Sequence, residues 1–203
     1  MFNLLGKIPT EPFYVAVSGG KDSMTILSFL RKYPKNKFEL LYFNHGTEHG
    51  QEAEEFLIKF CEREKLTLNI GRISKEKPKG QSPEQFWRDQ RYEFFDSFNG
   101  TIITCHHLGD VIETWIFTAL RGHPKLIPHV RGKYLRPFLK VTKSQIDGWA
   151  KKNKVEYIED PSNATLKYSR NKIRHQIVPL ALTVNPGLET TLRNLLDKPL
   201  EIC

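Results

Sequence analysis

The chain has 203 residues, of which 39% are hydrophobic and 27% are charged, and its formal net charge is +8. This length allows one sizeable core with a small appendage and excludes several full domains. No stretch approaches the roughly 18 apolar residues of a membrane span, and the first residues lack the apolar segment of a secretory signal. We therefore expect a cytosolic protein without a membrane partner.

The three cysteines, Cys61, Cys105 and Cys203, are far apart in the sequence and form no CxxC pair. Disulfide frameworks and zinc ribbons need cysteines paired at characteristic spacings, so neither is indicated here. We expect all three thiols to be reduced.

The positive charge is concentrated in one segment. Residues 121–175 hold 14 Lys and Arg against four Asp and Glu, a net charge of +10, whereas the rest of the chain carries −2. In this basic block arginines are mixed with the aromatic residues Tyr134, Trp149, Tyr157 and Tyr168. A solvated lysine-rich face is the simpler interpretation. Arginine beside aromatic rings instead favours phosphate contacts and base stacking, so we expect the block to bind a polyanion.

The first 105 residues alternate between two periodicities. Four short apolar runs indicate strands, at residues 13–17, 38–44, 67–73 and 101–105. Helical spacing follows the first two runs, over residues 22–33 and 51–65, and Ser82 with Pro83 begins a third helix that extends to about Phe98. This alternation is typical of a parallel sheet with helices on both faces, so the predicted fold class is α/β and Rossmann-like.

Beyond Arg121 the alternation gives way to loops punctuated by Gly and Pro, and then to helix-like segments at residues 142–153, 169–177 and 187–196. This change is the only candidate boundary in the chain. We expect an α/β core over residues 1–135, followed by a basic helical extension of the same domain over residues 136–203.

The stretch VAVSGGKDS, residues 15–23, joins the first strand to the first helix. Ligands of open parallel sheets bind beyond the carboxyl ends of the strands, where this loop lies. Residues 18–20 can turn their backbone amides inward as an anion nest, and the helix adds the positive end of its dipole. Lys21 and Ser23 would add donors, whereas Asp22 would repel phosphate unless it caps the helix, holds Mg²⁺ or does both. A plain glycine turn is the alternative.

The loop follows neither GxGxxG nor the Walker pattern GxxxxGK[ST]. It resembles SGGxDS, the pyrophosphatase loop of the PP-loop, adenine nucleotide α-hydrolase-like enzymes. These enzymes split ATP into AMP and pyrophosphate by adenylating a substrate. The resemblance implies that this loop holds the pyrophosphate end of ATP.

A second polar cluster follows the fourth strand, in the stretch CHHLGDVIET at residues 105–114. Asp110 and Glu113 are three residues apart and share one helix face, near the sheet edge expected for the glycine loop. Two carboxylates in that position could bind an ammonium group or Mg²⁺. The alternative is a solvated first helical turn, where the helix dipole favours acids in any case.

This cluster resembles HHxxDxxET of the tRNA(Ile)-lysidine synthetases, and further segments agree with that family. In chain order they are the RDQRY helix at 88–92, LRG at 120–122, RP at 136–137, DPSN at 160–163, and then Tyr168, RN at 170–171 and IR at 173–174. Together, the segments from DPSN to IR are similar to the family signature DPSN…Y.RN.IR. The matching blocks keep their order from about residue 13 to residue 196.

Two positions depart from the family pattern. Gly109 stands where HHxDDxxET has its first acid, and Glu48 stands where [DH]HGLR has arginine. Family members also continue into C-terminal domains that help to hold the tRNA. We therefore expect either a minimal form or a fragment of a longer protein.

The resemblance implies a ligase that forms a carbon–nitrogen bond, uses ATP and Mg²⁺, and converts the wobble cytidine of a tRNA(Ile) with a CAU anticodon to lysidine. The cytosine C2 oxygen attacks the α-phosphate of ATP, and pyrophosphate leaves. The ε-amine of free L-lysine then displaces AMP. A homodimer stays open as the assembly.

The resemblance also implies roles for individual residues. The catalytic set is Asp22, Arg88, Asp110 and Glu113. The ATP-binding set is Ser18, Gly19, Gly20, Lys21, Asp22, Ser23 and His45, with Asp22 as the Mg²⁺ ligand. Asp110 and Glu113 would bind lysine, and Arg91, Arg121, Arg136, Arg170 and Arg174 would bind tRNA. For Arg88 and Arg91 a helix surface with salt bridges is the alternative.

Two other functions stay open. A tRNA thiolase of the same superfamily also adenylates a base carbonyl, but it would use cysteines, and no second cysteine lies near Cys105 in the sequence. A non-catalytic module that binds nucleotide or RNA is the other alternative. The presence of SGGKDS, Asp110 and Glu113 argues against such a loss of activity.

Overall fold

The structure is a computed structural model that describes residues 2–33, 37–161, 165–166 and 169–197. The chain forms two compact units that interleave along the sequence. We call residues 9–105 with 150–159 the sheet unit, and residues 1–8, 106–149 and 160–203 the helical unit. The sequence predicts a boundary at residue 135, between a nucleotide-binding core and an extension. The two units do not test this division, so it stays a prediction. Within the described ranges, no helix is long and apolar enough to cross a membrane.

The sheet unit is built on four parallel strands in the order β3-β2-β1-β4. Their bounds are β1 (Phe13–Ala16), β2 (Phe38–Asn44), β3 (Leu68–Arg72) and β4 (Ile102–Thr104). Val15 pairs with Leu40 on one side and with Ile103 on the other, and all three side chains are fully buried. Each predicted strand is confirmed to within one residue at either end.

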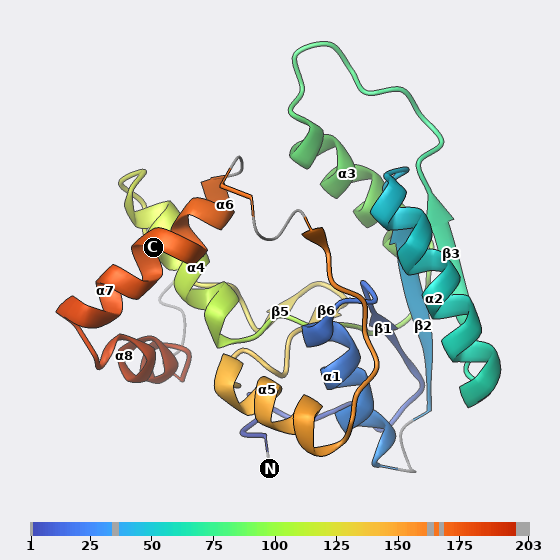
Figure 1. The fold of residues 1–203 in the computed structure, drawn as a ribbon, viewed down its shortest axis with the longest axis horizontal. Helices are drawn as coiled ribbons and strands as arrows, with labels where there is room; N and C mark the ends of the chain where they lie inside the picture. Colours follow the sequence, from blue (N-terminus) through green and yellow to red (C-terminus); the bar gives the residue numbers. More distant parts are fainter. Residues whose placement is uncertain (1, 34–36, 162–164, 167–168, 198–203) are drawn as a thin grey trace. The chain divides into compact units, whose positions relative to one another are not determined.

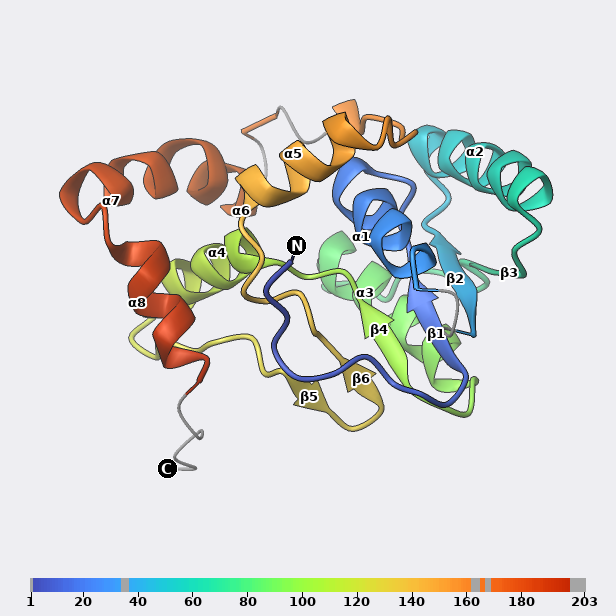
Figure 2. The same ribbon diagram turned by 90° about the horizontal axis from the view of Figure 1, so that it is seen from below.

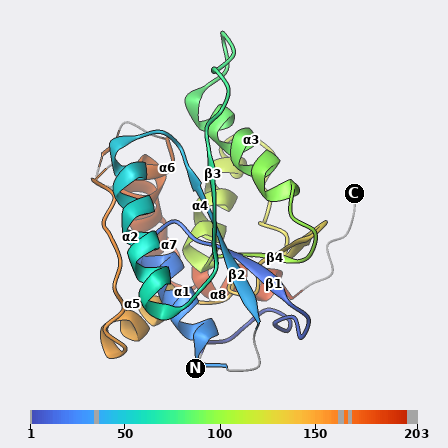
Figure 3. The ribbon, with the colours of Figure 1, turned by 90° about the vertical axis from the view of Figure 1, so that its right-hand side faces the viewer.

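Helices cover both faces of this sheet, as the sequence predicts. Figure 3 shows α1 (Lys21–Arg31) and α2 (Glu48–Glu64) on one face and α3 (Pro83–Asp96) on the other. Ser82 caps α3 by accepting a hydrogen bond from the Gln85 amide at 3.2 Å. The helix packs closely on β3, because a Cβ on Gly71 would lie only 2.5 Å from the Phe94 ring.

The helical unit gathers around α4 (Leu108–Ala119). The elements that follow are β5 (Val130–Arg131), β6 (Tyr134–Leu135), α5 (Lys143–Lys152), α6 (Ser169–Lys172), the π-helix η2 (Ile173–Ile177), α7 (Val178–Val184) and α8 (Leu188–Leu195). Figures 1 and 2 show α7 and α8 beside α4. The core includes Val111, Ile112, Ile173 and Leu192. The predicted helical C-terminal segment is confirmed, whereas the β5–β6 hairpin and α7 were not predicted.

Candidate active site

The loop after β1, which we call the cradle, is held together by its own serine side chains. Gly19 has a φ of +78°, a conformation that favours glycine. Ser23 is buried, and its hydroxyl donates to the Gly20 carbonyl at 2.9 Å and accepts from the Ser18 amide at 3.1 Å. Because this hydroxyl proton is used inside the loop, Ser23 holds the loop in shape. The first turn of α1 then presents amides that have no partner within the helix, as every helix N-terminus does.

Asp22 does not cap α1, which corrects one of the two roles expected for it. The N-cap is Gly20, and it makes no side-chain cap hydrogen bond. Asp22 lies in the first turn of the helix, where a carboxylate interacts favourably with the dipole. The expected role as a Mg²⁺ ligand stays a prediction.

Residues 157–158, which precede the DPSN motif, contact this loop. Ile158 forms a parallel bridge with Gly20, and its amide donates to the Gly19 carbonyl at 3.0 Å. The Lys21 ammonium lies 5.8 Å from the centroid of the Tyr157 ring. No sequence pattern predicts these contacts, because they join residues more than 130 positions apart. They make residues 157–158 part of the frame of the cradle.

A buried polar network lies at the carboxyl end of β2. Glu54 of α2 is 4% exposed and accepts hydrogen bonds from Asn44 at 2.8 Å and from Arg72 Nε at 3.2 Å. The hydrogen bond from Arg72 and that from Asn44 lower the pKa of Glu54, although burial opposes this. Asn44 also accepts from the Gly46 amide at 2.8 Å, so the network sets the path of the chain past His45. Glu54 and Arg72 were not predicted, because they belong to no motif, whereas Asn44 begins the segment that resembles [DH]HGLR.

His45 lies between aromatic rings just beyond β2. Its ring centroid is 5.7 Å from that of Trp87 and 5.2 Å from that of Phe43. Burial, and then the nearby charge of Arg91, lower the pKa of His45 to about 4. The ring is therefore neutral at pH 7. Its Nδ1 atom is buried without a hydrogen-bond partner among the described residues.

The arginines of α3 are stacked on an aromatic ring. Arg88 lies 5.0 Å and Arg91 lies 5.7 Å from the centroid of the Tyr92 ring. The two acids nearby on the helix are engaged by other groups: Asp89 accepts from Gln81 and Gln85, and Glu93 pairs with Lys75. The expected roles of Arg88 and Arg91 stay predictions, and a helix surface with salt bridges stays the alternative.

In the helical unit, α4 begins with a capping box. The His107 ring accepts from the Gly109 amide at 3.0 Å, and the Asp110 carboxylate accepts from the His107 amide at 2.8 Å. Burial raises the pKa of Asp110, but His107, His106 and Arg174 outweigh this effect and hold it below its ordinary value. Asp110 is therefore a carboxylate at neutral pH.

Asp110 and Glu113 share one face of α4, as predicted, and both meet a cation. Glu113 is 7% exposed and accepts two hydrogen bonds from the Arg174 guanidinium, at 2.6 and 3.1 Å. The same guanidinium lies 3.9 Å from an Asp110 oxygen. Arg174 thus joins the acidic pair, and its expected contact with tRNA stays a prediction. We call these three residues the acid–arginine cluster.

The other arginines expected to contact tRNA differ in exposure. Arg136 is 3% exposed and donates to the Pro128 carbonyl at 2.8 Å, so it belongs to the packing of the hairpin and not to an exposed basic surface. Arg121 is exposed and stacks on Phe117 at 4.0 Å, and Arg170 is exposed on α6. Ser162, Asn163 and Tyr168 of the DPSN signature lie outside the described residues.

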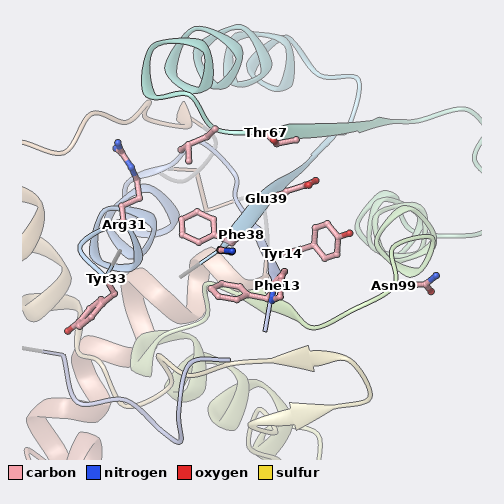
Figure 4. A pocket seen from close by; sticks show the side chains of 11 residues that line it. Phe13, Tyr14, Arg31, Tyr33, Phe38, Glu39, Thr67 and Asn99 are labelled. Carbon is pink, nitrogen blue, oxygen red and sulfur yellow. The ribbon is translucent and has the colours of Figure 1, made fainter. Parts of the chain in front are cut away.

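A hollow in the sheet unit lies at the other end of the strands (Figure 4). Its lining includes Phe13 and Phe38, the first residues of β1 and β2, together with Arg31, Tyr33 and Lys37. Ligands of parallel sheets bind at the carboxyl ends of the strands, whereas this hollow is at the amino ends. We therefore do not assign it to the site.

The described cysteines, Cys61 and Cys105, are free thiols. Burial raises the pKa of Cys61 to about 11, so this thiol is protonated at neutral pH. The Cys105 thiol donates to the Ala16 carbonyl at 3.4 Å. In the described ranges, no three His, Cys, Asp or Glu side chains gather as a metal site.

Comparison with known proteins agrees with this geometry. A family model described as "PP-loop domain" matches residues 2–181. The chain is 34% identical over 203 residues to a tRNA(Ile)-lysidine synthase of Thermotoga maritima, which covers 92% of this chain and 49% of that protein. It is 33% identical over 195 residues to the one of Exiguobacterium sibiricum, covering 90% and 46%. The chain thus spans about half the length of these curated relatives.

Two solved structures resemble the fold. One is the U34-tRNA thiolase NcsA from Methanococcus maripaludis with its [4Fe-4S] cluster, with a TM-score of 0.73 and 18% identity over 95% of this chain and 74% of that one. The other is an NH3-dependent NAD synthetase from Campylobacter jejuni, with a TM-score of 0.52 and 16% identity over 95% and 89%. At these identities the likeness shows the fold alone. From the family match, the parallel sheet and the SGGKDS cradle, the chain belongs to the PP-loop domain family of ATP-binding proteins.

Proposed function

We propose that the chain carries out the ATP-dependent ligation of L-lysine to C2 of the wobble cytidine in a tRNA(Ile) with a CAU anticodon. The cytosine C2 oxygen attacks the α-phosphate, so that a C–O–P bond forms and pyrophosphate leaves. The lysine ε-amine then forms a C–N bond at C2, and AMP leaves with the oxygen. The similarity to tRNA(Ile)-lysidine synthases supports this reaction.

The cradle after β1 suits the first half of this reaction. Charge that develops on pyrophosphate is stabilised by preorganised amides and by the Lys21 ammonium. Mg²⁺ in nucleotide sites is usually held by one or two carboxylates together with the phosphates, and Asp22 in the first turn of α1 fits that role. When bound, the ion would neutralise phosphate charge, while the protein's amides orient the leaving group.

The acid–arginine cluster is the observation that supports the second half of the reaction, the attachment of lysine. Glu113 already holds a cationic nitrogen group in a two-point contact, so this pair of acids can bind one. Asp110, Glu113 and Arg174 are two carboxylates and one guanidinium, so these three side chains together carry one net negative charge. That charge matches a single lysine ammonium. A carboxylate there could also accept the proton that the amine must lose before it attacks.

Thiol chemistry has no comparable support. The Cys61 thiol is protonated at neutral pH and buried in α2, so it is a poor nucleophile and a poor metal ligand. The Cys105 thiol is used as a donor to the backbone of β1. We therefore favour lysine over a sulfur donor as the second substrate.

Asp110→Asn tests the role of the acid pair. Asparagine can still accept the His107 amide, so α4 keeps its cap, but one of the charges that bind ammonium is lost. A charge-assisted contact is worth about 1.5 to 3 kcal/mol, so we expect the KM for lysine to rise about ten- to a hundredfold. The KM for ATP should change less than about twofold, a difference of under about 0.4 kcal/mol.

The control for this experiment is Asp147→Asn, which removes an acid of α5. It should leave both KM values unchanged. If Asp110→Asn raised the KM for ATP and the KM for lysine equally, the acid pair would act through a metal ion and this part of the proposal would be wrong.

A further inference from the structure

The rings of His45 and Trp87 form a small aromatic surface in the sheet unit, which we call the α3 slot. Their centroids are 5.7 Å apart and their planes are tilted by 41°. Both residues are only partly buried. Arg91 lies one helical turn from Trp87 on α3. Its charge is close enough to His45 to lower the pKa of that ring.

The α3 slot is more polar than core packing requires. The buried Nδ1 of His45 has no hydrogen-bond partner among the described residues. Buried polar atoms in proteins are nearly always satisfied, so an exception points to a group that binds there. A phenylalanine would fill the same space beside Phe43 and Trp87 without this cost. Packing alone therefore does not account for a histidine.

The α3 slot also lies at the correct end of the sheet for a substrate. His45 directly follows β2, whose neighbour β1 leads into the ATP cradle. Asn44, the residue before His45, bonds to Glu54 of α2 on one face of the sheet, whereas the His45 ring meets Trp87 of α3 on the other. A group bound at the α3 slot would thus approach the carboxyl edge from the face opposite α1 and α2.

The charges around the α3 slot indicate which kind of group it takes. Arg91 stacks on Tyr92 and also lies close enough to His45 to lower its pKa, so one planar guanidinium group lies near the aromatic surface. Aromatic rings that stack on a base, flanked by arginines that contact the backbone, are the recurring means of binding single-stranded RNA. A neutral histidine ring suits stacking better than a charged one, since it does not have to be desolvated as a cation.

We propose that His45 and Trp87 stack on one unstacked base of a single-stranded RNA segment, while Arg91 contacts the adjoining phosphate. This inference rests on the proposed function, which requires a base to be turned out of the anticodon loop. It adds the place where that base is held. ATP would bind at the cradle, so this inference replaces the expected role of His45 in ATP binding.

The experiment compares the Kd of the full chain for a fluorescently labelled anticodon stem-loop with its Kd for ATP. Trp87→Ala should weaken RNA binding about five- to a hundredfold, the range that corresponds to one base–aromatic stack. Trp87→Phe should restore most of the affinity. Gln85→Ala, an exposed change on another face of α3, is the matched control and should have no effect. Thermal melting of each variant shows that it is folded.

A stem-loop with an abasic wobble position provides the decisive comparison. The wild-type chain should bind it as weakly as Trp87→Ala binds the intact RNA, and Trp87→Ala should lose no further affinity for it. Losses that add would show that Trp87 contacts something other than this base. A loss of ATP affinity with RNA binding intact would assign the α3 slot to adenine. Either result would overturn the inference.

The outcome is separable from that of the proposed function. If no lysine were incorporated but Trp87 and the wobble base were still coupled, the chain would bind the base without ligating lysine. If lysine were incorporated with no coupling, the reaction would stand and the inference about the α3 slot would be wrong.

Discussion

Single residues explain both departures from the lysidine synthetase pattern. Glu48 is the first residue of α2, directly after the N-cap Thr47, where an acid interacts favourably with the helix dipole and an arginine would not. Gly109 lies where a Cβ would come within 2.7 Å of the His107 ring. Since that ring caps α4, the glycine protects the start of the helix that carries Asp110.

Gly109→Ala should therefore destabilise the protein, although alanine is the better helix former. The added methyl would displace His107 and remove the cap, at a cost of about 1 kcal/mol. Gly148→Ala is the matched control, because a Cβ there meets nothing within 4 Å, and it should stabilise α5 by about 0.5 to 1 kcal/mol. Thermal unfolding measures both. A gain in Tm for Gly109→Ala would show that the cap does not depend on this space.

Glu54 should make stability depend on acid pH. Its pKa is lowered by Arg72 in the folded state, so the ion pair stabilises the fold above the ordinary pKa of a glutamate. That contribution is lost as the pH falls through the lowered pKa. Glu54→Gln should cost about 1 to 3 kcal/mol at pH 7 and flatten the acid side of the stability curve. Urea unfolding between pH 3 and pH 7 tests this, and parallel curves for the two proteins would refute it.

At the scale of elements, the sequence pattern predicted the parallel strands through their apolar runs and the helices that cover them through their helical spacing. It missed the β5–β6 hairpin, whose two-residue strands are too short to alternate, and it merged α6 with η2, which differ in hydrogen bonding rather than in spacing.

The acid pair of α4 was predicted from its spacing. The partnership of Glu113 with Arg174 was not, because a charge pattern cannot tell a surface arginine from one that pairs with a buried acid. The burial of Arg136 was missed for the same reason.

The N-terminus of α1 gives a prediction that follows from the corrected cap. Because Gly20 and not Asp22 is the N-cap, Asp22→Asn should change stability by no more than about 2 kcal/mol, the upper end for a partly buried charge at a helix dipole. It should nevertheless greatly reduce ATP–pyrophosphate exchange at saturating Mg²⁺. Ser18→Ala is the comparison, since it loosens the loop without removing charge. Exchange that survived Asp22→Asn would exclude this carboxylate as a Mg²⁺ ligand.

At the scale of the whole molecule, the basic block of residues 121–175 should make RNA binding depend on salt. The logarithm of the affinity should fall by about 0.7 to 0.9 per neutralised phosphate for each unit in the logarithm of salt concentration. Arg121→Ala and Arg170→Ala remove exposed cations, so each should reduce this slope. Arg136→Ala should leave the slope unchanged and lower the Tm, because Arg136 is buried. A slope that neither Arg121→Ala nor Arg170→Ala reduces would show that the block is not an RNA surface.

The central claim is that one chain couples ATP cleavage at the cradle to the attachment of lysine to a cytidine. The most direct measurement supplies ATP, radiolabelled lysine and a tRNA(Ile) transcript with a CAU anticodon, and counts the products. We predict equal amounts of AMP, pyrophosphate and RNA-bound lysine, with the label in the wobble nucleoside and none in a transcript whose wobble base is uridine. AMP and pyrophosphate formed with no lysine on the RNA would contradict the account.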